Sequence, residues 1–131
     1  MTARFVTAIA CLLGAMLQLS PARAQGGPPT TLSDDPYSRA VVCAAHLALS
    51  VQATRDKDAT VAAKMEDGMA RWLLRGVNLA PKAGRTVEQM NSAVKFNLDM
   101  LRIFVGNPQD REKVLQNVST CSKEAAVLPA K

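Results

Sequence analysis

The fold of this chain is decided by the stretch from residue 34 to residue 55, DDPYSRAVVCAAHLALSVQATR. Its apolar residues recur at spacings of three and four, which is typical of an α-helix that buries one side. Ser33, directly before the stretch, is a natural N-cap, and Pro36 is tolerated in the first turn of a helix. The stretch therefore predicts a first helix over residues 34–55.

Three further segments with helical spacing follow. Asp58 is placed to cap a second helix that runs to about residue 75, which Gly76 and Pro81 are expected to end. Thr86 and Gln89 have the spacing of a capping box, and this pair opens a third helix. Asn107 precedes a proline and is placed to cap a fourth helix.

No segment alternates between apolar and polar residues as a strand does, and only 4% of the residues are aromatic. The sequence therefore predicts an all-α fold, with one helical domain over residues 34–131. Short connections favour antiparallel neighbours, so we expect an up-down-up-down four-helix bundle in which the first and last helices are adjacent.

The N-terminus predicts export. Arg4 precedes an apolar run over residues 5–19, and Ala22-Arg23-Ala24 is a small-x-small site of the kind that signal peptidases cleave. The run is shorter than the roughly 20 residues that span a bilayer, so we expect no stable membrane anchor after cleavage. Residues 1–24 are thus interpreted as a signal peptide and residues 25–33 as a flexible lead. The mature protein is expected to be periplasmic or secreted.

Cleavage would remove Cys11 and leave two cysteines, Cys43 and Cys121. In an oxidising compartment an even number of cysteines favours a disulfide, here between the first and last helices, although two reduced buried cysteines remain an alternative. Loss of Arg4 and Arg23 lowers the formal net charge by two, from +5 to +3. This weak positive charge is spread along the chain and does not favour nucleic-acid binding.

No motif in the sequence favours an enzyme, and no cofactor is expected. His46, the only histidine, falls on a narrow polar strip of the first helix, which predicts a solvated side chain. A copper- or haem-binding protein would need His46 together with a methionine, for which Met65 and Met69 are the candidates. Both methionines lie on the expected core face of the second helix, where methionine usually fills space.

The most informative feature is an excess of apolar residues. The third helix carries Phe96, Met100 and Ile103 well away from its core stripe, and the first helix adds Val42 and Leu49. A bundle helix needs one apolar stripe, so a second stripe indicates another contact, unless irregular packing covers it. That contact would be a homo-oligomer, a periplasmic protein partner, or the wall of a small apolar pocket. The sequence therefore predicts a small exported helical protein that binds another protein or a small apolar ligand.

Overall fold

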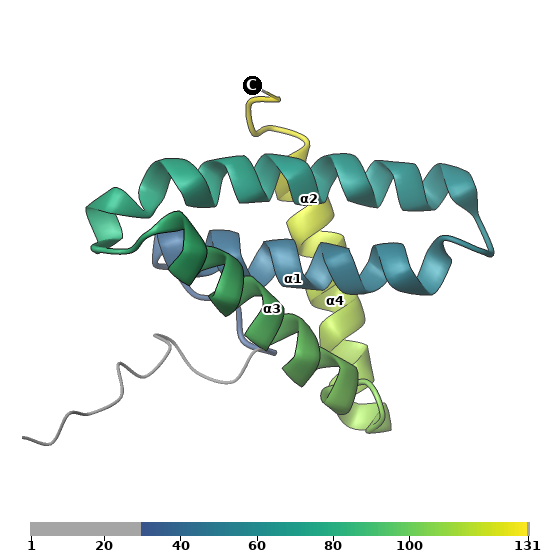
Figure 1. Cartoon of the computed structure of the whole chain (residues 1–131). Helices are drawn as coiled ribbons and strands as arrows, with labels where there is room; N and C mark the ends of the chain where they lie inside the picture. The colour runs from purple at the N-terminus through teal and green to yellow at the C-terminus, as the bar shows by residue number, and fades with distance from the viewer. Residues whose placement is uncertain (1–29, 131) are drawn as a thin grey trace, which may run out of the picture.

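The computed structural model describes residues 30–130, in which four α-helices are present (Figure 1). They are α1 (Pro36–Thr54), α2 (Ala59–Leu79), α3 (Val87–Phe104) and α4 (Pro108–Ala125), with a short 3-10 helix, η1 (Pro81–Ala83), between α2 and α3. The all-α prediction is confirmed for this part of the chain. The expected signal peptide, residues 1–24, lies outside the described residues, as do residues 25–29 of the expected lead.

The N-terminal caps predicted for α2, α3 and α4 are confirmed, because each cap side chain accepts a hydrogen bond from the backbone of its own first turn. At α1 the cap is Asp35 rather than Ser33. The Asp35 carboxylate accepts from the N–H of Ser38 at 2.8 Å, and this hydrogen bond lowers the pKa of Asp35. Ser33 lies two residues before this cap, and its hydroxyl accepts from the N–H of Asp35 at 3.1 Å.

α1 is the central helix of the molecule. It contacts α2, α3 and α4, whereas α3 has few contacts with either α2 or α4. α1 and α2 run antiparallel side by side, α3 crosses α1 obliquely, and α4 crosses both steeply (Figure 1). The arrangement therefore differs from the expected up-down-up-down order, in which each helix would mainly contact two neighbours in a ring. Residues 40–54 include no Asp, Glu, Lys or Arg, so α1 can be enclosed on three sides without burying a formal charge.

Two glycines let α2 lie close to its neighbours. A Cβ atom at Gly68 would come within 2.9 Å of the Leu47 side chain, and one at Gly76 within 2.7 Å of the Met90 sulfur. Both glycines are buried. Of the two residues expected to end the second helix, Gly76 does not end it: α2 continues to Leu79, and Pro81 follows its C-cap Ala80. Gly76 instead provides room for the Met90 side chain of α3.

The core consists of two clusters on either side of α1. One surrounds Cys43 and Cys121, includes Trp72 of α2, and is joined by partly buried side chains of α2, α3 and α4. The other brings Ala45 of α1 against Leu101 of α3 and Val114 of α4. The central helix thus contributes to both clusters, which explains why its apolar arc is so wide.

The described part of the expected lead, residues 30–33, is bound to the helices. The carbonyl of Thr30 accepts from the Asn117 side chain at 2.7 Å, and the carbonyl of Ser33 accepts from Arg39 at 3.0 Å. Leu32 packs against the cluster around the two cysteines. Within residues 30–130, none of the helices has the length and apolar character that a membrane crossing needs.

Candidate functional site

The outer face of α3 carries exposed apolar side chains. Phe96 is 56% exposed and Ile103 is 70% exposed, while Met100 between them is half-buried. On the opposite face of the same helix, Met90 and Leu101 are almost completely buried. The core stripe of α3 is therefore satisfied within the chain, and the second stripe, which we call the outer stripe (Phe96, Met100 and Ile103), faces away from it.

The other two residues expected at an interface lie elsewhere. Val42 is only 6% exposed, and Leu49 is half-buried against the cluster of Ala45 and Leu101. The expectation of a second outward-facing stripe on the first helix is therefore corrected for Val42. A helical wheel shows how wide an apolar arc is, but not how many neighbours cover it, and α1 has three.

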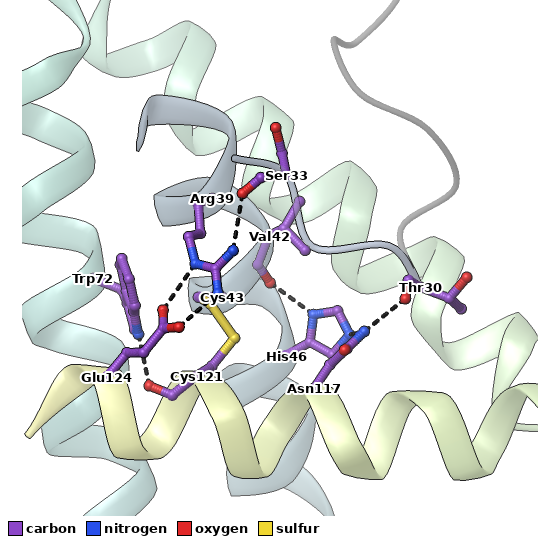
Figure 2. The surroundings of a disulfide bond; sticks show 10 residues. All are labelled: Thr30, Ser33, Arg39, Val42, Cys43, His46, Trp72, Asn117, Cys121 and Glu124. Atoms are coloured by element: carbon purple, nitrogen blue, oxygen red, sulfur yellow. Dashed lines mark hydrogen bonds and ion pairs between the residues drawn. A yellow bond between two sulfur atoms is a disulfide. The ribbon is translucent and has the colours of Figure 1, made fainter. Parts of the chain in front are cut away.

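The prediction of a solvated His46 is wrong. The ring is fully buried, with Nδ1 2.8 Å from the carbonyl oxygen of Val42 and Nε2 3.4 Å from Nδ2 of Asn117. Burial lowers the pKa of His46 because the protonated ring loses hydration, and the hydrogen bond to Val42 opposes this effect. The polar strip that the sequence places on the surface is covered in this turn by α4 and by Thr30 (Figure 2).

The candidate copper and haem ligands are engaged within the fold. Both ring nitrogens of His46 have partners, and Met65 and Met69 pack against the cluster around Cys43 and Cys121. Among residues 30–130, no group of three or more His, Cys, Asp or Glu side chains is arranged to hold a metal ion. A metal at His46 would have to displace Asn117 from Nε2.

The predicted disulfide is present between Cys43 of α1 and Cys121 of α4, whose α-carbons are 5.3 Å apart. Both cysteines are fully buried. The Trp72 indole N–H reaches across from α2 and donates to the carbonyl of Cys121 at 2.9 Å (Figure 2). The disulfide and this hydrogen bond together connect α1, α2 and α4 at one level of the core.

A shallow groove of about 310 Å³ lies beside Trp72, where the start of α1, the second half of α2 and the end of α4 meet. Apolar contact in it comes mainly from Pro36, Val127 and Leu128, because Trp72 is only 3% exposed. The remaining lining residues are charged, and they are Asp34, Arg39, Arg75 and Glu124. The groove therefore combines a small apolar floor with a rim of both charge signs.

Arg39 and Glu124, which both line the groove, form a bidentate ion pair (Figure 2). Arg39 donates from Nε to one carboxylate oxygen of Glu124 at 2.8 Å and from Nη2 to the other. These hydrogen bonds lower the pKa of Glu124 and raise that of Arg39. Because both side chains are partly exposed, solvent screens the pair and its contribution to stability is modest.

Three parts of this region had no marker in the sequence. Asn117 looks like an ordinary polar helix residue, and the long-range pairing of Arg39 with Glu124 has no local spacing that would indicate it. For Trp72, an expected core position was visible, but the acceptor of its N–H was not. The only usable signal was the cysteine pair, which predicts that α1 and α4 lie together without specifying their other contacts.

No protein-family model matches this chain, and no curated protein and no solved structure matches it either. The geometry of the chain itself therefore carries the functional argument.

Proposed function

We propose that this chain is an exported helical protein, without catalytic activity, that binds a protein partner through the outer stripe of α3. The observation that carries the proposal is the exposure of Phe96 and Ile103, 56% and 70%, on a helix whose opposite face is already buried. A helix of a monomeric bundle gains nothing from a second apolar stripe, and clustered exposed apolar residues mark contact surfaces.

The spacing of the outer stripe favours a helical partner. Residues 96, 100 and 103 follow the four-three spacing that two helices use when their side chains interdigitate. The charged residues beside the stripe are already paired, since Asp99 binds both Lys95 and Arg102. The stripe therefore offers apolar contact without unpaired charge at its side, which suits an amphipathic helix of another protein or a second copy of this chain.

Export is supported by the sequence pattern of residues 1–24 and by the Cys43–Cys121 disulfide, because such bonds persist in oxidising compartments such as the periplasm or the outside of the cell. The test is expression of the full chain in a bacterial host, followed by mass measurement of the protein in the periplasmic fraction. A product that begins at Gln25 and carries no free thiol agrees with the proposal. An uncleaved or reduced product contradicts it.

The partner contact is tested by placing a photo-cross-linking amino acid at position 96 or 103 in the cell of origin, with position 66 on α2 as the matched control. Glu66 is also exposed, but it lies on a polar face. We expect covalent adducts at 96 and 103 and none at 66. Sedimentation velocity of the purified protein then separates a second copy from another protein. A monomer without specific adducts at 96 and 103 contradicts the proposal.

A second candidate function, binding of a small apolar ligand, is favoured by the groove of about 310 Å³ beside Trp72, a volume at the lower end of ligand pockets. Trp72 is the only tryptophan of the chain, so its fluorescence reports on this groove. The test is titration with an apolar dye such as anilinonaphthalene sulfonate. Saturable binding that Leu128→Lys weakens supports the groove, whereas binding that Phe96→Ser weakens instead assigns the dye to the outer stripe.

A further inference from the structure

His46 is a buried titratable group that the proposed function does not use. It belongs to a cluster of four residues from three parts of the chain, Val42 and His46 of α1, Asn117 of α4, and Thr30 of the N-terminal segment (Figure 2). We call these four residues the His46 cluster. Every link in it is a hydrogen bond, and Asn117 is the residue that joins the helices to the N-terminal segment.

The hydrogen bonds fix which nitrogen of His46 carries the proton. The carbonyl oxygen of Val42 can only accept, so Nδ1, at 2.8 Å from it, must be the N–H of the neutral ring. Nε2 is then a bare acceptor, and it lies 3.4 Å from the amide nitrogen of Asn117. The same amide nitrogen donates its other hydrogen to the carbonyl of Thr30 at 2.7 Å. One NH2 group thus serves two acceptors.

We propose that the His46 cluster is a proton-dependent attachment, which holds residues 30–32 against the helices when His46 is neutral and releases them when the ring is protonated. A proton on Nε2 converts the acceptor into a donor that faces the N–H of Asn117. Rotation of the Asn117 amide would offer Oδ1 to the ring, but it would place that oxygen against the carbonyl oxygen of Thr30. Asn117 therefore cannot bind the protonated ring and Thr30 at the same time.

No neighbouring charged side chain of the described residues is among the influences that set the protonation of His46. The influences on the pKa of His46 are burial and the hydrogen bond to Val42. Several charged residues of the surrounding elements are bonded elsewhere, Arg39 to Glu124, Asp67 to Arg71, Asp99 to Lys95 and Arg102, and Asp35 to Ser38. Lys113, one turn from Asn117 on α4, is exposed, and Asp34 is exposed at the groove.

Release would affect more than one hydrogen bond. Leu32 packs against the cluster around Cys43 and Cys121, so detachment of the segment uncovers part of the core surface. The carbonyl of Ser33 also accepts from Arg39, which keeps the far end of the segment attached. The change is therefore confined to residues 30–32 and leaves the start of α1 in place.

The experiment follows the uniformly ¹⁵N-labelled, oxidised protein by NMR from pH 7.5 to pH 4. His46 is the only histidine, so one pair of ring nitrogen signals reports its protonation without overlap. Backbone relaxation of Thr31 and Leu32 reports attachment. We expect order parameters near 0.85 when the ring is neutral and below about 0.6 when it is charged. The midpoint of this change should coincide with the midpoint of the ring titration.

Two variants test whether protonation of His46, acting through the Asn117 amide, causes the release. His46→Gln carries no titratable group, so residues 30–32 should keep one mobility across the whole pH range. Asn117→Leu removes the amide, so the segment should be mobile at every pH while the helices stay ordered. Should His46→Gln prove unable to fold, Asn117→Leu alone still tests whether the amide holds the segment.

Four results would overturn the proposal. They are a segment that stays rigid after the ring is protonated, a ring that stays neutral down to pH 4, an unchanged acid response in His46→Gln, and a loss of order in α1 at the same midpoint as residues 30–32. The third result would assign the response to carboxylates. The fourth would mean that acid unfolds the whole protein instead of releasing one segment.

Discussion

The region around Cys43 and Cys121 and the outer face of α3 use apolar residues in opposite ways. Around the cysteines, apolar side chains from all four helices meet, and the buried polar groups of Trp72 and His46 have hydrogen-bond partners. On α3, Phe96 and Ile103 are exposed, with no side chain of the described chain covering most of their surface. The first region holds the helices together, whereas the second is the surface that the proposed function assigns to a partner.

The largest effect is expected from the inner face of α3. Leu101 is fully buried, so Leu101→Ala should lower the free energy of unfolding by about 2–5 kcal/mol through lost burial and the cavity left behind. Phe96→Ala on the outer face is the matched control and should change it by less than about 0.5 kcal/mol. Urea unfolding of the oxidised protein measures both. Equal losses would show that Phe96 is part of the core after all.

Removal of the disulfide should have a similar but somewhat smaller effect. The bond joins residues that are 78 positions apart, so it restricts the unfolded chain strongly. The double variant Cys43→Ala/Cys121→Ala should lose about 2–4 kcal/mol of stability. Reduction of the wild-type protein with dithiothreitol serves as the control and should produce a comparable loss. A negligible loss in both would mean that the helices hold this level of the core without the bond.

Acid should destabilise the protein through His46. Burial lowers the pKa of its ring below the usual 6.5, so the folded state binds the proton more weakly than the unfolded state does. The stabilising contribution is therefore complete above pH 6.5 and declines as the pH falls from 6.5 toward the lowered pKa of the folded state. Within this window the slope is at most about 1.4 kcal/mol per pH unit. Thermal unfolding of the wild-type protein and of His46→Gln across this pH window measures the loss of stability. If the stability of both proteins fell in parallel with pH, the loss could not be assigned to His46.

The smallest effect on stability should accompany the largest effect on binding. The double variant Phe96→Ser/Ile103→Ser removes the exposed apolar groups of the outer stripe, and it should change the free energy of unfolding by no more than about 0.5 kcal/mol per site. Adducts formed through a cross-linker at position 100 of the same variant should disappear. A variant that unfolds, or that keeps its adducts, would remove the distinction between the two regions.

Local features of the fold could be predicted from the sequence because their causes are local. The caps of α2, α3 and α4 depend on residues within one turn, and Asp58, Thr86 and Asn107 are all where the sequence indicates. The cysteine pairing could be predicted from their number. The exposure of Phe96 and Ile103 followed from their angular distance from the core stripe, although the sequence left open whether other parts of the chain cover them.

The remaining features depend on how helices are arranged around α1. His46 and Val42 were placed on outward-facing arcs, and both are buried because three helices enclose α1. Gly76 has the appearance of a helix end, but its neighbour Met90 comes from a different helix. Asn117 and Thr30 are 87 positions apart, and no pattern within the chain indicates that they meet.

The position of the disulfide also determines how the protein responds to a protease. The bond closes a covalent ring that contains all three connections between the helices. A single cut in any of those connections leaves two fragments that remain one molecule under oxidising conditions, and their core contacts can persist. Such a nicked protein would migrate as one band on a non-reducing gel and as two bands after reduction.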